Sequence, residues 1–327
     1  MLIFDLADPQ ELVGFTRGVQ QEQDANRFIL SQFLPNQNID DIEWRATTGQ
    51  LRDEDATTVR AWDAESPIGG RQGVRRLFGE LPPISRKYRL GEEERLRMRA
   101  LDRGGDLGQI VDAIFNDAAK GARSVAARIE LFRGEALWKA RLDINENGVV
   151  QTVDFGRDDD LTVGAAVAWS DHTVAALTEE LAWRETYLDI NGGVGPEVAL
   201  ISDEALTHVL LNEQYRGLAA YAGITPAFLN IEQVNQVRVA GAHQRVIPAE
   251  QLVYLPPSSE ALGATFTGIT AEALELQQAS QIQQSEVSGM VAVVEKSFDP
   301  GATWTKTAAV ALPVLMNPDL TMSAEIL

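Results

Sequence analysis

Histidine is the residue most often used for acid–base chemistry and metal binding near neutral pH, and this chain of 327 residues has only three, about 35 positions apart. They are His172, His208 and His243. No two have the local spacing of a metal site, and the lack of cysteine excludes thiolate ligands, thiol nucleophiles and disulfides. His172 follows Asp171 at an expected helix start, where a capping or surface role is favoured over a catalytic one.

Local motifs of nucleotide and hydrolase chemistry are missing from the sequence as well. The Gly-Lys pair of a phosphate-binding loop never occurs, and neither Gly-x-Ser-x-Gly, His-Glu-x-x-His nor Gly-x-Gly-x-x-Gly is present. The acidic run Asp158–Asp160 lacks the alternation and distal glutamate of a calcium loop, and we interpret it as a solvent loop. Asn191–Pro196 is interpreted as a flexible connector. We therefore expect no catalytic residue, no cofactor and no metal site.

Charge is distributed unevenly along the chain, which has 48 acidic and 28 basic residues and a formal net charge of -20. Residues 1–140 have a net charge of -3 and residues 141–327 one of -17, whereas residues 71–103 hold ten bases against five acids. This balance is unlike the basic footprint of proteins that read nucleic acids. Either the acids only keep the protein soluble, or the basic segment of one subunit docks on the acidic half of the next.

The first 90 residues divide into an expected arm and a polar segment that has few large apolar side chains. Residues 1–45 are expected to form an extended arm with one short helical patch near Asp8–Val19, and the opening MLIFDLADPQEL has no basic region of the kind that starts a signal peptide. Residues 46–90 are polar and interrupted by Pro82-Pro83. We interpret them as a long hairpin or loop that cannot bury itself and must lie on another molecule.

Residues 91–140 carry the strongest helical pattern. Apolar residues recur with a 3.6-residue period from Leu107 to Leu137, which predicts a strut about 50 Å long. Asn147-Gly148 then predicts the turn of a hairpin over residues 140–156. Later elements are expected to be helices from Ser170 or Asp171 to about Leu188 and from Asp203 to about Ala222, and strands at 236–241, 245–257, 290–298 and 304–316. No run of about 18 apolar residues suits a membrane span.

This order of parts resembles the Hong Kong 97-type capsid fold, an α+β fold. Individual phrases resemble the lambda-like, E-type family of major capsid proteins of tailed bacteriophages, and the resemblance extends over essentially the whole chain. The phrases are QFLPNQNIDDIEW (32–44), VYLPP (253–257), LGATFTGITAEALEL (262–276) and VALPVLMNPDLTMSAEIL (310–327).

The resemblance implies a division of the chain and a role for each part. The parts would be an N-terminal arm (1–45), an extended loop or β-hairpin (46–90), a peripheral domain with a spine helix and hairpin (91–156), an axial domain (157–287), and returning peripheral strands with a tail (288–327). Subunits would form hexamers and pentamers that close into an icosahedral shell around double-stranded DNA, held without sequence-specific binding. The protein would be made in the host bacterial cytoplasm and end in the virion, with no membrane contact.

Scaffold, portal and decoration proteins are candidate partners that the resemblance also implies. Relatives cross-link the loop through a lysine, but nothing marks Lys87 as reactive, so cross-linking is not expected here. From the charge pattern we expect six basic residues to dock on acids of an adjacent subunit: Arg71, Arg75, Arg76, Arg86, Lys87 and Arg89.

Three other functions stay open at this point. An encapsulin-like nanocompartment would share the fold but house a cargo enzyme. A tail-tube protein would be mainly β, which the strut helix disfavours. An acidic enzyme with a dispersed active site is disfavoured by the missing motifs but is not excluded.

Overall fold

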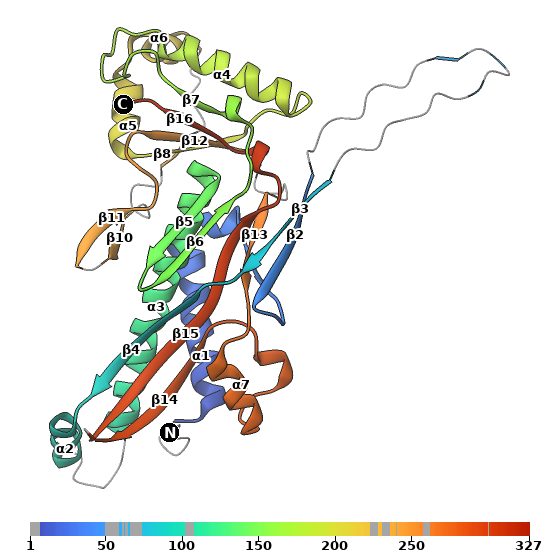
Figure 1. Ribbon diagram of the computed structural model, residues 1–327. Coiled ribbons are helices and arrows are strands. Elements are labelled where there is room, and N and C mark those ends of the chain that lie inside the picture. The colour runs from blue at the N-terminus through green and yellow to red at the C-terminus, as the bar shows by residue number, and fades with distance from the viewer. Residues whose placement is uncertain are drawn as a thin grey trace.

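Figure 1 shows the computed structural model, which has an elongated body and a smaller lobe at one end. The structure describes residues 7–49, 59–60, 62, 65, 74–101, 108–222, 228–230, 236–239, 241–257, 262–299 and 301–327. Among these residues no helix has both the length and the apolar character needed to cross a bilayer.

A 32-residue helix, α3 (Gly108–Lys139), runs along the body and confirms the predicted strut. Its buried side repeats every three or four residues, as in Ile114, Ala118, Ala122 and Val125, so one face packs on the core. The helix ends at Ala140, whose φ of 51° turns the chain sharply into the next strand. A separate short helix, α2 (Glu92–Leu101), precedes it.

The central sheet is built around one long strand, β15 (Gly301–Leu315). It pairs antiparallel with β14 (Val291–Phe298), β4 (Pro83–Leu90) and β13 (Gly263–Thr267), and β1 (Asn36–Asn38) joins β13 in parallel. The expectation that residues 46–90 cannot bury themselves is therefore wrong for β4, which is an edge strand of the body. An edge strand needs backbone hydrogen bonds to only one neighbouring strand. β4 can therefore join the sheet although most of its side chains are polar and exposed to solvent.

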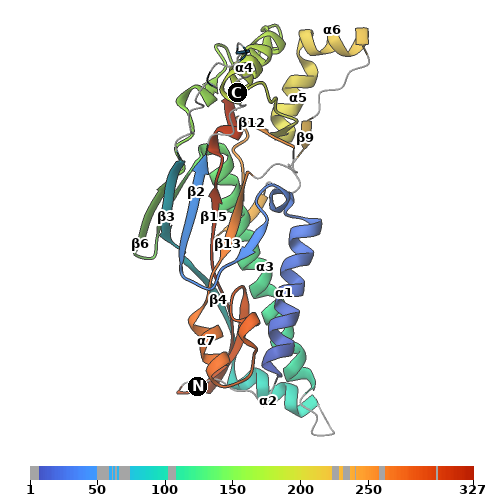
Figure 2. The same ribbon diagram turned by 90° about the vertical axis from the view of Figure 1, so that its right-hand side faces the viewer.

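The N-terminal part of the body contains a longer helix than predicted. Helix α1 (Pro9–Asn26) lies alongside α3 in both views (Figure 1 and Figure 2). Asp8 caps it by accepting a hydrogen bond from the Gln10 backbone N–H at 3.0 Å. Leu12, Val13 and Val19 are buried. The helical patch expected near Asp8–Val19 is thus confirmed and continues for seven residues more, because apolar residues at helical spacing have a core face to cover. A 3₁₀ turn, η1 (Ile29–Gln32), then leads to β1.

The smaller lobe contains a five-stranded sheet whose two faces serve different cores. Leu200 and Val253 pack into the core of the body, whereas Ala199, Leu252 and their neighbours pack into the core of the lobe. The strands, in spatial order, are β7 (Thr162–Gly164), β16 (Met322–Glu325), β12 (Gln251–Leu255), β8 (Val198–Ile201) and β9 (Phe228–Asn230). The lobe and the body are therefore packed together through a shared sheet.

Helices cover the outer side of the lobe, with bounds that differ from the prediction. Helix α4 (Ala176–Ile190) begins about five residues later than expected. The helix expected from Asp203 to Ala222 is two helices, α5 (Asp203–Leu211) and α6 (Glu213–Ala222). They are separated at Asn212, whose side-chain Oδ1 accepts a hydrogen bond from the Gln214 backbone N–H and so caps the second helix.

The remaining elements include a predicted hairpin and several elements whose place in the body or the lobe differs from the prediction. The hairpin β5 (Arg141–Glu146) and β6 (Val149–Asp154) turns at Asn147-Gly148, both with positive φ, as predicted. β13 and helix α7 (Ala271–Gln278) belong to the body, and β16 belongs to the lobe, so the expected boundary at residue 287 does not separate the two. The rest are β10 (Gln236–Val239), β11 (Ala242–Arg245), η2 (Asp159–Leu161), η3 (Gln284–Glu286) and η4 (Pro318–Leu320).

Candidate assembly surfaces

A hairpin at the side of the body consists, in its described part, of the antiparallel strands β2 (Glu43–Gly49) and β3 (Val74–Glu80) (Figure 2). Its cross-strand pairs alternate between two faces. Trp44 opposite Gly79 and Ala46 opposite Leu77 form the inner face, and Trp44 is only 1% exposed. Gly79 packs closely here, since an added Cβ would lie about 3.1 Å from the indole ring of Trp44. The inner face therefore fixes the base of the hairpin to the body.

The outer face of the same hairpin carries one large apolar side chain among charges. Phe78 is 82% exposed and stands opposite Arg45, while Arg76 stands opposite Thr47. An aromatic ring flanked by arginines is the composition typical of the energetic centre of a protein interface. We name Phe78, Arg45 and Arg76 the hairpin outer face.

The basic residues singled out in the sequence do not form one patch. Arg75 and Arg76 lie on β3, and the guanidinium of Arg75 rests against Gly156 of the body so closely that a methyl group there would overlap it. Arg86, Lys87 and Arg89 lie on β4 instead. Arg71 lies outside the described residues. The structure thus brings only Arg75 and Arg76 to the described part of the hairpin.

The three basic residues of β4 make contacts within their own subunit. Arg86 Nη1 donates to Ser124 Oγ of α3 at 3.0 Å. Lys87 and Arg89 point to the other face of the strand, where the Lys87 ammonium lies 4.6 Å from the centre of the Trp304 ring. Such a cation–π contact at an exposed site is worth about 0.5–1 kcal/mol.

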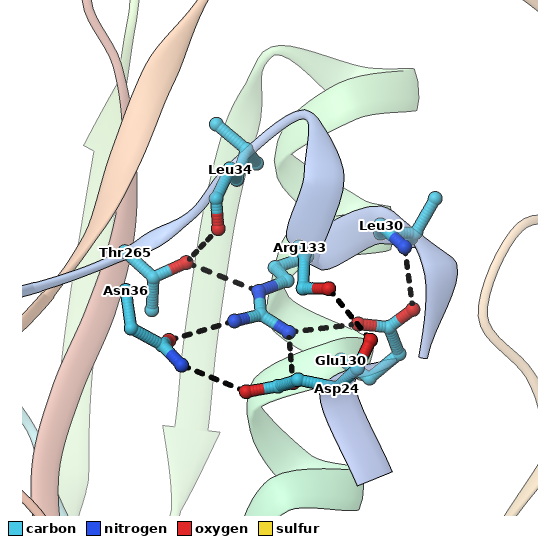
Figure 3. A network of polar contacts seen from close by, with 8 residues as sticks. Asp24, Leu30, Leu34, Asn36, Glu130, Arg133 and Thr265 are labelled. Carbon is cyan, nitrogen blue, oxygen red and sulfur yellow. Dashed lines mark hydrogen bonds and ion pairs between the residues drawn. The ribbon is translucent and has the colours of Figure 1, made fainter. Parts of the chain in front are cut away.

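A buried polar network, missed in the sequence, ties the N-terminal segment to the spine helix. Arg133 of α3 has no exposed surface and donates to Glu130 Oε2 at 3.1 Å and to Asp24 Oδ1 of α1 at 2.8 Å (Figure 3). It also donates to Asn36 Oδ1 at 2.7 Å and to Thr265 Oγ1 at 3.1 Å. The only sequence signal is a glutamate and an arginine three residues apart on the apolar face of the helix.

Glu130 completes this network and is itself fully buried. Its Oε1 accepts from the backbone N–H of Leu30 at 3.2 Å, which anchors η1. Burial raises the pKa of Glu130 to about 7, and the opposing effect of Arg133 is smaller. One arginine faces two carboxylates, so the buried cluster carries an excess negative charge when all three groups are ionised.

The lobe presents further apolar and polar features. Trp169 stacks on Trp183 with 5.5 Å between ring centres, so these tryptophans serve packing. Leu181, Leu210 and Leu211 are exposed on its helices. His172 and His208, distant in sequence, meet with 3.1 Å between Nε2 and Nδ1. Within the described residues no group of three or more metal-ligating side chains gathers.

Comparison with solved structures gives the class of this fold. A putative capsid protein of a prophage of E. coli CFT073 superposes with a TM-score of 0.66 and 13% identity, covering 98% of this chain and 99% of that one. A phage-related protein from Bordetella bronchiseptica RB50 gives 0.58 and 13%, covering 96% and 95%. The capsid of the cyanophage P-SCSP1u gives 0.50 and 9%, covering 90% and 86%. The fold is that of Hong Kong 97-type capsid proteins.

The sequence itself provides the more specific assignment. The model of the family described as phage major capsid protein E matches residues 12–326. No curated protein matches the sequence significantly. The chain belongs to the phage major capsid protein E family, and it is a shell-forming structural protein of the virion. The expected resemblance is thereby confirmed.

Proposed function

We propose that this chain assembles through hexamers and pentamers into an icosahedral shell around double-stranded DNA, and that the hairpin outer face makes a principal contact between neighbouring subunits. The body is the peripheral domain in this proposal, and the lobe is the axial domain that meets its copies at the symmetry centres. No catalytic step is assigned to any residue. The subunit is made in the host cytoplasm before assembly.

The observation that carries the proposal is the exposure of Phe78 on the hairpin of β2 and β3. A phenylalanine that is 82% exposed leaves most of its ring in water, and covering it would contribute roughly 1.5–3 kcal/mol. Phe78 stays exposed on its own subunit in the described structure, so we expect a second copy of the chain to cover this face. Contact between unlike patches of identical chains closes rings and shells.

Charge favours the same partner. Arg45 and Arg76 flank Phe78, and residues 141–327 of every copy carry a net charge of -17. Complementary charge raises the rate and specificity of docking more than its affinity. An acidic subunit also suits a DNA container, because genome phosphates are not held at the inner wall. For the six basic residues, intersubunit docking remains part of the proposal for Arg76 in particular, since Arg75 and the β4 residues make contacts within the subunit.

Substitution on the hairpin outer face tests the proposal. Phe78→Ala is expected to lower the yield of closed shells at least tenfold in negative-stain microscopy and sedimentation, while the dissociated subunit melts as the unmodified one does. Val150→Ala, which removes a comparably exposed side chain from the tip of β6, is the control and should assemble normally. Shells of Phe78→Ala that form in full yield would overturn the proposed contact.

Two further measurements separate the parts of the proposal. Arg76→Glu should lower shell yield and salt tolerance, and unchanged values would argue against the electrostatic contribution. An encapsulin-like nanocompartment has the same fold, and nucleic-acid content decides between the two. Particles purified from infected or induced cells should contain double-stranded DNA, whereas a cargo enzyme in place of DNA would favour the compartment.

A further inference from the structure

Two of the stretches of chain that pass between the body and the lobe lie next to each other at the end of the spine helix. One runs from Phe155 to Leu161, between β6 and β7, and the other from Met316 to Thr321, between β15 and β16. The C-terminal end of α3 lies beside both. Arg157 belongs to the first stretch. Its guanidinium contacts the end of α3, the second stretch and the first residue of β7.

The guanidinium of Arg157 has acceptors on both sides of this junction. On the side of the body, its Nη2 donates to the Trp138 carbonyl at 3.0 Å and its Nη1 to the Leu137 carbonyl at 3.4 Å. On the side of the lobe, the same two nitrogens donate to Thr162 Oγ1 at 2.9 Å and to Thr321 Oγ1 at 3.3 Å. Each terminal nitrogen therefore bridges the two parts.

Charge suits Arg157 to this place. The last carbonyls of a helix have no partner within it and carry partial negative charge, so a cation there is favoured. Burial lowers the pKa of Arg157 to about 10, against the opposing effect of Asp319, and the group remains ionised at neutral pH. The Asp319 carboxylate in turn accepts from the backbone N–H of Asp158 at 2.8 Å, which holds the two crossing stretches together.

The second crossing stretch is also fixed to the lobe from its other side. Tyr187 of α4 donates its hydroxyl to the Leu320 carbonyl at 2.9 Å, and Asn191 Nδ2 donates to the Asp319 carbonyl at 3.0 Å. The junction is thus held to α4 by these bonds and to α3 by Arg157. Arg157 makes a hydrogen-bonded connection from the spine helix to the lobe, in addition to the packing of the shared sheet.

We propose that Arg157 is a positioning residue that sets the angle between body and lobe, and through that angle the curvature of the shell. The proposal rests on the proposed function, in which hairpin contacts and lobe contacts belong to different neighbours. If the two sets of contacts are held by separate parts of the subunit, the angle between those parts decides how many subunits close a shell. A planar guanidinium fixes four acceptors in one geometry, whereas a lysine ammonium has three rotatable donors and cannot reproduce the fork.

Particle size is the readout, because a residue that only stabilised the fold would leave it unchanged. Arg157→Lys is expected to give shells of more than one diameter, with a size distribution at least twice as broad in electron micrographs. Arg141→Lys is the matched control, since Arg141 lies on nearby β5 and pairs only with Asp143 in the described structure, and it should keep one diameter. Arg157→Lys shells of a single, unmodified diameter would overturn the proposal.

A milder variant decides the case if Arg157→Lys does not yield soluble subunits. Thr162→Val removes one acceptor on the side of the lobe and leaves Arg157 and the end of α3 in place, and the same broadening is expected in smaller measure. A single diameter for this variant would then count against the proposal. Failure of the unmodified chain to form closed shells would instead contradict the proposed function, so the two failures are distinguishable.

Discussion

Glu130 and Arg133 lie one turn apart on the spine helix, both without exposed surface, with 3.1 Å between Oε2 and Nη1. A buried ion pair is costly to desolvate and gains stability only when every hydrogen-bonding group finds a partner. Here the partners come from α1, η1, β1 and β13, so the pair specifies how the N-terminal segment sits on the body.

The raised pKa of Glu130 predicts how subunit stability depends on pH. The folded protein holds a proton on Glu130 up to about pH 7, whereas the unfolded chain releases it near 4.5, so the folded state binds more protons in between. The stabilisation is complete below pH 4.5 and is lost as pH rises through 7, with a slope of up to about 1.4 kcal/mol per pH unit. Urea unfolding of dissociated subunits at several pH values measures it.

Glu130→Gln should remove this contribution and flatten the profile between pH 5 and 7. Glu135→Gln is the control, because Glu135 lies on the same helix and pairs with Lys139 at a partly exposed site. Identical slopes for the unmodified chain and Glu130→Gln would contradict the assignment.

Arg133→Lys should destabilise the subunit by roughly 3–5 kcal/mol, the cost expected when a buried charge network loses a partner. One ammonium cannot reach Asp24, Glu130, Asn36 and Thr265 together, so carboxylates or the amide stay buried without a donor. Amide exchange should quicken in residues 9–38 before it does in the lobe. A loss below 1 kcal/mol with uniform exchange would show that the network does not hold the N-terminal segment.

Two glycines in helices predict opposite effects of a single methyl group. A side chain at Gly134 would lie 2.4 Å from the backbone carbonyl of Val246, which has little freedom to move, so Gly134→Ala should cost about 1–3 kcal/mol. Gly14 in α1 has no neighbouring atom within 4 Å, and Gly14→Ala should stabilise the subunit by about 0.5–1 kcal/mol. Thermal unfolding of the two variants compares their stability changes directly. A change of the same sign in both variants would contradict this packing.

The fold was predictable where a local pattern decides the structure. The 3.6-residue repeat that ends at Leu137 predicted α3, and Asn147-Gly148 predicted the hairpin that follows it. β4 was misjudged because a strand with one polar face looks unable to pack until its partner, β15, is known. The meeting of His172 with His208 and the Arg133 network depend on tertiary contacts between distant segments, which no local spacing reports.

A cryo-electron microscopy map of purified particles decides whether the hairpin outer face docks on a neighbouring subunit. We expect a closed shell in which Phe78 of each subunit is covered by an adjacent copy, with Arg45 and Arg76 facing its acidic residues. Closed particles in which Phe78 is left in solvent, or is folded back onto its own subunit, would contradict it.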